Sequence, residues 1–122
     1  MSTIRVDTFG PSAGGTTYSA RGIAKAWVNF DGTGTIAARD SENVSSLTDN
    51  GTGDYTVNFS NAFGAADYSI VVTGNGGSTT LRIMGSSGAD PASGSCRLQA
   101  FTFGGSLADA LFPSTAFHGD LA

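Results

Sequence analysis

Alternation of apolar and polar side chains is the clearest pattern in the chain, and it becomes regular at Lys25. A period of two is typical of a strand that buries one face, so each such run predicts a half-buried β-strand. In the run 54–60, the apolar side chains Tyr55, Val57 and Phe59 share the face that we expect to point inward. The runs that predict strands are residues 25–30, 35–39, 43–48, 54–60, 67–73, 79–84 and 96–103.

Turn-forming residues separate these runs. Asn50-Gly51 is the strongest turn signal, because this pair favours the hairpin turn whose twist matches the flanking strands. About seven strands joined by short hairpins predict an all-β fold, an antiparallel β-sandwich. In the sixth run we expect Leu81 and Ile83 to point inward. Residues 107–112 fit either a helical turn or an edge strand, and residues 85–95 read as a long loop of small residues.

The first 22 residues differ from the rest because they are irregular and rich in turn residues. We therefore divide the chain into an N-terminal arm, residues 1–22, and a single β domain, residues 23–122. Ile4, Val6 and Phe9 could form a short strand or an arm that packs on a neighbouring subunit, and a disordered leader fits the sequence equally well.

Composition narrows the class of protein. The 122 residues include 18 glycines, and only 13% are charged, which excludes a coiled coil or a charged helical bundle. The net charge of −4 argues against a nucleic-acid binder, which needs a basic face. No stretch approaches the ~20 apolar residues of a membrane span, and no apolar signal core is present, so we expect no membrane insertion and synthesis in a cytoplasm.

Candidate catalytic chemistry is sparse. The single cysteine, Cys96, reads as a small buried hydrophobe, and the single histidine, His118, lies near the C-terminus. Acidic residues near the hairpin tips lack the spacing of a calcium loop and suit tight turns instead. We therefore expect a non-enzymatic protein with no catalytic residues, no cofactor and no metal.

The candidate interface lies on the polar face of the first strand, where Lys25, Trp27 and Asn29 share one side. Tryptophan is enriched at interfaces because it combines a large apolar area with a polar group. Burial of Trp27 in a second core layer is the alternative. Trp27, Tyr55 and the Asn/Asp loops could also stack on sugars and hydrogen-bond to them, which would make the chain a carbohydrate-binding module for host-surface glycans.

Two long runs carry a resemblance to a known family: ARGIAKAWVNFDGTGT at residues 20–35 and RDSENVSSLTDNGTGDYTVNF at residues 39–59. They closely resemble a module of bacteriophage and prophage tail-fibre-like proteins, and the likeness covers roughly residues 20–73. The resemblance implies a virion structural protein, a homotrimer without catalysis, made in the host cytoplasm. A short tail fibre bound to the tail and a capsid decoration protein (head fibre) bound to the major capsid protein both remain open. In either case we expect the hairpin tips and the 85–95 loop to be free for a partner.

Overall fold

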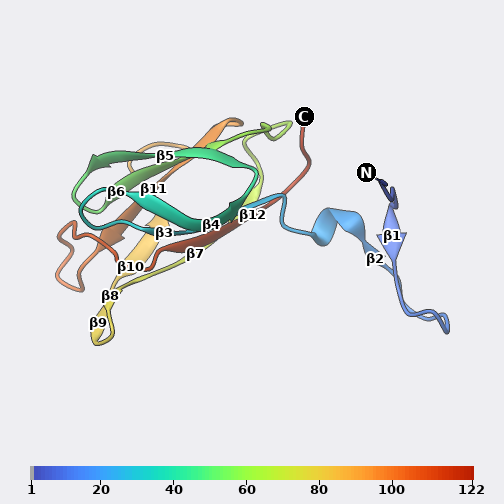
Figure 1. The fold of residues 1–122 in the computed structure, drawn as a ribbon, viewed down its shortest axis with the longest axis horizontal. Helices are drawn as coiled ribbons and strands as arrows, with labels where there is room; N and C mark the ends of the chain where they lie inside the picture. The colour runs from blue at the N-terminus through green and yellow to red at the C-terminus, as the bar shows by residue number, and fades with distance from the viewer. Residues whose placement is uncertain (1) are drawn as a thin grey trace.

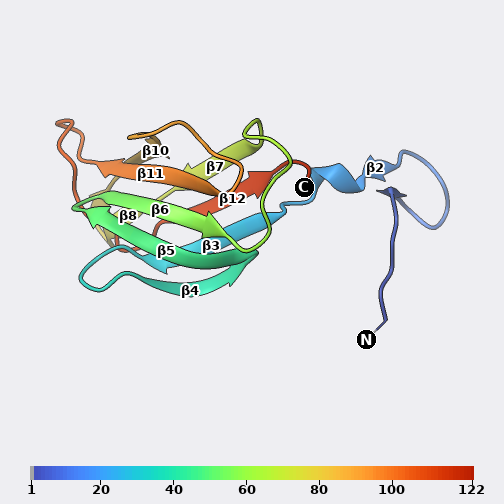
Figure 2. The same cartoon turned by 90° about the horizontal axis from the view of Figure 1, so that it is seen from above.

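The computed structural model describes residues 2–122 and contains two four-stranded antiparallel sheets that lie face to face (Figures 1 and 2). The expected all-β antiparallel fold is confirmed. The first sheet, called the β6 sheet, has the order β10 (Ile83–Ser86), β11 (Ser95–Phe101), β6 (Asp54–Phe59), β5 (Val44–Gly51). The second, called the β3 sheet, has the order β4 (Ala37–Glu42), β3 (Ala26–Asp31), β12 (Ser114–His118), β7 (Ser69–Thr73).

Four short strands and one helical turn lie outside the two sheets. The hairpin of β8 (Asn75–Gly77) and β9 (Thr80–Leu81) stands at one end of the sandwich. At the other end, β1 (Thr8–Phe9) pairs with β2 (Tyr18–Ser19), and the 3-10 turn η1 (Ala20–Gly22) leads from them into β3. Residues 2–22, called the arm from here on, extend away from the body in both ribbon views.

The core fills the space between the two sheets. Tyr55, Val57 and Phe59 of β6 point into it, as predicted. Phe59 meets Phe117 edge-on, with ring centroids 4.9 Å apart, so the two sheets contact each other through aromatic side chains. The other buried apolar residues are Ala26, Val28, Phe30, Phe63, Tyr68, Cys96, Leu98, Ala100 and Ala110.

The chain crosses from one sheet to the other at Asn43, the single residue between β4 and β5. Asn43 has a φ of 55° and is the only non-glycine residue with positive φ among residues 2–122. Its side-chain oxygen accepts a hydrogen bond from the Asn61 backbone N–H (2.7 Å), and its amide nitrogen donates to the Asn61 carbonyl (3.0 Å). Asparagine tolerates this backbone region better than other residues with a side chain, so residue type and geometry agree.

Several sequence expectations differ from the structure, which has short strands beyond the seven predicted ones, among them β8 in the expected turn at residues 74–77. Residues 114–118 form β12, which lies in the middle of a sheet, although no strand was predicted there. Residues 107–112 are irregular apart from a bridge between Leu107 and Phe101, so they form neither a helical turn nor an edge strand. The expectation that Leu81 and Ile83 point inward is wrong, because both are more than half exposed.

The break between β9 and β10 explains the exposure of Leu81 and Ile83. Arg82 interrupts the predicted strand, and its guanidinium donates to the backbone carbonyl of Asp109 at 2.9 Å. Beyond the break, Met84 packs against the core. The side chain of Met84 therefore points inward, and that of its neighbour Ile83 points outward.

The second half of the 85–95 loop is attached to the body. The Tyr68 hydroxyl donates to the carbonyls of Ala92 (2.8 Å) and Ser95 (3.0 Å). The Phe63 backbone N–H donates to the Ser93 carbonyl at 2.9 Å. These contacts fix residues 92–95. At the other end, Gly85 and Ser86 belong to β10 and pair with β11, and the Gly88 carbonyl accepts a hydrogen bond from Arg97 at 3.4 Å, so both ends of the predicted loop are attached to the body.

Candidate interaction surface

The outer face of the β3 sheet carries two of the three residues that the sequence singles out. Because Ala26, Val28 and Phe30 are buried, the alternating residues Trp27 and Asn29 point away from the core. Trp27 is 36% exposed, so this chain provides no second core layer around it.

Strand pairing extends this surface across β12 and β7. Trp27 lies opposite Ala116, and Ala116 lies opposite Val71. Since residues directly opposite one another share a face of the sheet, the three form an apolar row. A parallel row consists of Asn29, Ser114 and Thr73.

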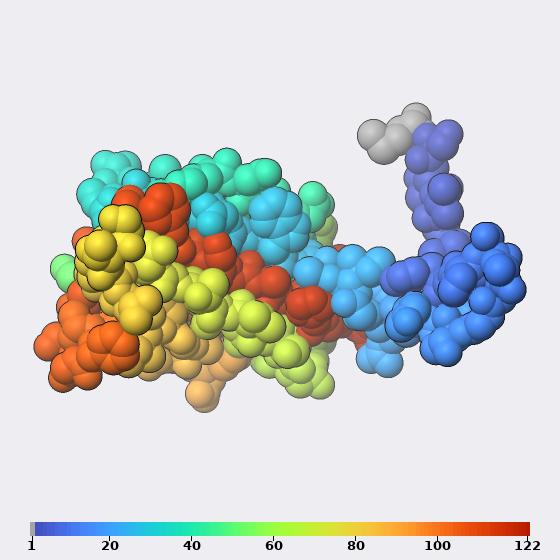
Figure 3. All heavy atoms as spheres, turned by 90° about the horizontal axis from the view of Figure 1, so that it is seen from below, coloured from blue at the N-terminus to red at the C-terminus, as the bar shows by residue number. Residues whose placement is uncertain are grey.

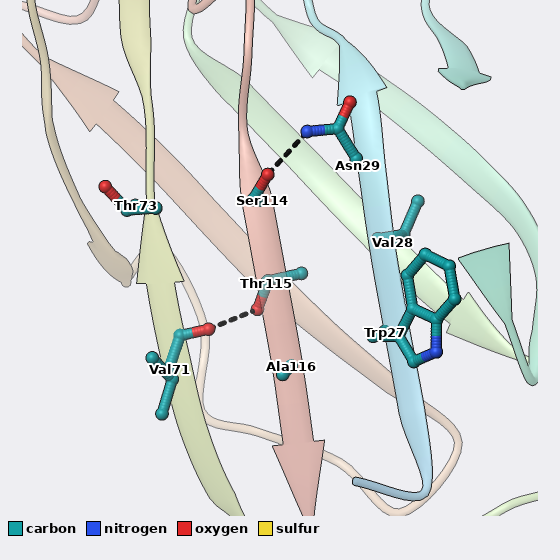
Figure 4. A pocket seen from close by; sticks show the side chains of 8 residues that line it. All are labelled: Trp27, Val28, Asn29, Val71, Thr73, Ser114, Thr115 and Ala116. Atoms are coloured by element: carbon teal, nitrogen blue, oxygen red, sulfur yellow. Dashed lines mark hydrogen bonds between the residues drawn. The ribbon is translucent and has the colours of Figure 1, made fainter. Parts of the chain in front are cut away.

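A shallow groove of about 230 Å³ runs over these rows (Figure 4). The small side chain of Ala116 lies between Trp27 and Val71, which leaves the hollow open. We call this surface the Trp27 face and define it by its outward residues Trp27, Asn29, Val71, Thr73, Ser114 and Ala116. Sequence reasoning missed the β7 and β12 members, because only the strand order brings them beside Trp27.

Hydrogen bonds hold the polar part of the face in place. Asn29 Nδ2 donates to Ser114 Oγ at 2.5 Å, and Thr115 Oγ1 donates to the Val71 carbonyl at 3.0 Å (Figure 4). Both bonds cross between neighbouring strands. The shape of the Trp27 face is therefore fixed by the pairing of the three strands that carry it, β3, β12 and β7.

Lys25 does not line the groove. Its ammonium group donates to the carbonyls of Ala20 (3.2 Å) and Ile23 (3.1 Å), at the end of the 3-10 turn. Basic side chains stabilise the C-terminal carbonyls of helical turns in this way. The structure thus places Lys25 at the junction of arm and body, beside the Trp27 face but outside it.

The outer face of the β6 sheet has a different chemistry. Arg97 donates two hydrogen bonds to the Asp54 carboxylate, and Gln99 Nε2 donates a third at 2.9 Å. The Arg97 hydrogen bond is the main reason that the pKa of Asp54 falls from 3.8 to about 2. Asn58 Nδ2 likewise donates to the hydroxyls of Ser46 and Thr48. The polar groups of this face bond to one another, and its apolar side chains, Ile83 and the opposite Phe101, lie at one end of it.

The other candidate residues take structural positions. Cys96 is buried in the core, and burial raises the pKa of its thiol. His118 instead belongs to the outward-facing set of β12 and lines a depression beside Asp120. Tyr55 is fully buried, and its hydroxyl donates to the Gly32 carbonyl at 3.0 Å. The expectation that Tyr55 stacks on a sugar is therefore wrong.

The acidic residues at the hairpin tips bond to their own turns. Asp31 Oδ1 accepts hydrogen bonds from the hydroxyl and the backbone N–H of Thr33, and these bonds lower the pKa of Asp31. Asp49 Oδ1 accepts from the Gly51 N–H at 3.0 Å. Within residues 2–122, no group of three or more His, Cys, Asp and Glu side chains is placed to hold a metal ion.

Comparison with families, with curated proteins and with solved structures found no match to this chain. In the part of the chain that the structure describes, there is no helix with the length and apolar character needed to cross a membrane. The geometry of the Trp27 face and of the arm therefore carries the functional interpretation, together with the sequence resemblance.

Proposed function

We propose that this chain is a non-enzymatic structural protein of a bacteriophage particle, and that it acts as a homotrimer. Its role is a tail-fibre-like subunit attached to the tail or a capsid decoration protein attached to the major capsid protein. It is made in the host cytoplasm and incorporated into the virion. The resemblance of residues 20–73 to tail-fibre-like modules gives the proposal its class.

The observation that carries the proposal is the Trp27 face. A domain of this size buries only about two-thirds of its surface on folding, so association adds apolar burial that the single chain lacks. Trp27 and Val71, 36% and 59% exposed, are the side chains that such an association would cover. Tryptophan is one of the residue types enriched among those that dominate binding energy at interfaces.

Two measurements test the proposal. Native mass spectrometry at micromolar concentration should show a trimer, and a stable monomer would contradict the homotrimer. Immunogold labelling of particles from cells that carry the gene should place the protein on the virion. Label over heads indicates a decoration protein, label at the tail indicates a fibre, and unlabelled particles would contradict a virion role.

Carbohydrate binding is the second candidate function, and the groove beside Trp27 is the observation that supports it. Trp27 offers an aromatic surface, and Asn29 and Ser114 offer polar groups next to it. A glycan array tests this function directly. Specific binding that Trp27→Ala abolishes, and that the surface variant Phe103→Ala keeps, would favour it over a purely structural role.

A further inference from the structure

The arm contains apolar side chains that nothing in its own chain covers. Every residue from Ser2 to Ser19 is exposed, including Ile4 at 87%, Val6 at 55% and Tyr18 at 61%. The two-residue strands β1 and β2 are joined to each other, and the Phe9 and Tyr18 rings lie 6.1 Å apart. A lone two-stranded hairpin is at best marginally stable in water, so this one needs a surface to pack on.

The junction with the body directs the arm outward. Arg21 forms a two-bonded ion pair with Asp120, with Nε–Oδ1 and Nη2–Oδ2 distances of 3.0 and 2.7 Å. Lys25 ties the other side of the junction through the carbonyls of Ala20 and Ile23. Figure 3 shows the arm, in blue, standing clear of the body that follows it. Its apolar side chains are therefore presented to another molecule.

The Trp27 face offers the apolar surface and the acidic groups that could receive such an arm. Carboxylates border its apolar row, since Glu42 lies opposite Trp27 and Asp40 lies opposite Asn29 on the edge strand β4. The Arg39 guanidinium of β4 also reaches Asn29 Oδ1 (3.4 Å), but it pairs with Asp31 and donates to the carbonyls of Phe30 and Leu111. The ion pairs of residues 2–122 join Arg21 to Asp120, Arg39 to Asp31 and Arg97 to Asp54. Asp40 and Glu42 take part in none of them.

The arm offers a complementary pattern. Arg5 stands between Ile4 and Val6, and it takes part in none of those ion pairs either. A segment with two aliphatic side chains around one guanidinium matches an apolar row bordered by acidic groups. On the outer face of the β6 sheet the apolar pair of Ile83 and Phe101 lies at one end, and the carboxylate of that face, Asp54, is already bound by Arg97 and Gln99.

We propose that the arm of one copy docks on the Trp27 face of a neighbouring copy. Each copy then donates one arm and receives another, which is a head-to-tail contact. Such a contact closes when its rotation generates a ring, and a three-membered ring is the homotrimer proposed above. This inference rests on that homotrimer and adds the surfaces that build it.

The single tryptophan of the chain is the natural reporter, because Trp27 lies on the face itself. The arm variant Ile4→Asn/Val6→Asn changes two exposed side chains and leaves the core intact. Each buried aliphatic side chain contributes roughly a tenfold factor or more to association, so we expect about 100-fold weaker assembly. Trp27 emission should shift to longer wavelength, and acrylamide should quench it more strongly.

A mixing experiment separates docking between copies from docking within one copy. The arm variant is unfolded and refolded together with full-length Trp27→Phe, which has an intact arm and no tryptophan. Docking between copies predicts that emission returns to shorter wavelength, because the intact arm covers Trp27 of the variant. The triple variant Ile4→Asn/Val6→Asn/Trp27→Phe should have no such effect.

A matched control uses apolar residues that are as exposed but lie outside the arm. Leu81 and Phe103 are 64% and 76% exposed, so Leu81→Asn/Phe103→Asn removes similar apolar surface. This control should assemble like the unmodified chain and keep its Trp27 emission. Equal effects of the two double variants would overturn the proposal.

The remaining outcomes are distinct. An arm variant that stays trimeric with unchanged Trp27 emission overturns the arm contact and leaves the homotrimer standing. A red shift that mixing does not reverse shows docking within one copy and also overturns it. If the unmodified chain is itself monomeric at micromolar concentration, the homotrimer fails as well, while immunogold labelling still decides the virion role.

Discussion

Arg97 and Asp54 form a two-bonded ion pair on neighbouring strands, with Nε–Oδ1 and Nη2–Oδ2 distances of 2.8 and 2.6 Å. Asp54 is almost completely buried beneath this contact, although strand alternation places it on the outward side of β6. A bidentate guanidinium–carboxylate pair is a strong polar contact, and burial of the carboxylate limits its screening by water, although Arg97 itself is partly exposed.

This pair predicts a loss of stability in acid. The pKa of Asp54 is lowered in the folded chain from 3.8 to about 2, mainly by the Arg97 hydrogen bond. A lowered folded-state pKa gives stability that is complete above pH 3.8 and is lost as the pH falls through about 2. We expect about 1 to 2 kcal/mol from this group, reduced by the solvent that reaches Arg97.

Urea unfolding at a fixed protein concentration between pH 2 and pH 6 measures this dependence. Asp54→Asn should be less stable at pH 6 and should lose less stability towards pH 2 than the unmodified chain. Thr52→Ala, at an exposed neutral position of the same hairpin, should keep the unmodified pH profile. Identical profiles for Asp54→Asn and the unmodified chain would show that the pair does not control the acid limb.

Tyr55→Phe should destabilise the fold through polar groups. The Tyr55 hydroxyl donates to the Gly32 carbonyl and accepts from the Ala110 N–H at 3.1 Å, both in the interior. Removing it leaves a buried donor and a buried acceptor without their partner, which costs about 1–3 kcal/mol. Thermal or urea unfolding checks this value. A stability equal to that of the unmodified chain would mean that water replaces the hydroxyl.

Asn43 combines backbone conformation with side-chain hydrogen bonds, and two variants separate them. Asn43→Gly keeps the positive φ at no steric cost but loses the bonds to Asn61, so we expect a loss of about 1 kcal/mol. Asn43→Ala loses the hydrogen bonds to Asn61 and also places alanine at an unfavourable positive φ, so we expect the free energy of unfolding to fall by about 2 kcal/mol. Equal losses in urea unfolding would show that the backbone conformation contributes nothing.

The Cys96 thiol should be unreactive in the native protein. It is 1% exposed, and burial raises its pKa, so little thiolate is available to a reagent that needs it. Labelling with Ellman's reagent should therefore follow the opening of the core, and it should be complete at once in guanidinium chloride. Rapid stoichiometric labelling without denaturant would contradict the buried position.

The strands that sequence predicts well are those with local signals. β6 follows strict alternation and begins directly after a glycine-rich turn, so the prediction of its inward residues is correct. β12 has the same alternation, with Thr115 and Phe117 buried, but it spans only five residues after Pro113. Its short length gives a weak signal in any sequence window.

The candidate surface shows where local signals end. Trp27 and Asn29 could be predicted from one strand, because they alternate with its buried residues and so point to the opposite side. Val71 and Ala116 could not, because only the order β3–β12–β7 brings them beside Trp27. The burial of Asp54 was missed for a related reason, since its partners Arg97 and Gln99 come from a strand far along the chain.

The central place of β12 also determines how the chain can fold. β3 pairs with a strand from the opposite end of the printed sequence, so the β3 sheet cannot close until residues 114–118 have left the ribosome. Contacts between such distant residues slow folding, which for sandwiches of this kind takes milliseconds to seconds. During synthesis, one edge of β3 therefore stays unpaired until β12 has been made. A chain interrupted before residue 114 would keep that edge exposed and prone to aggregation.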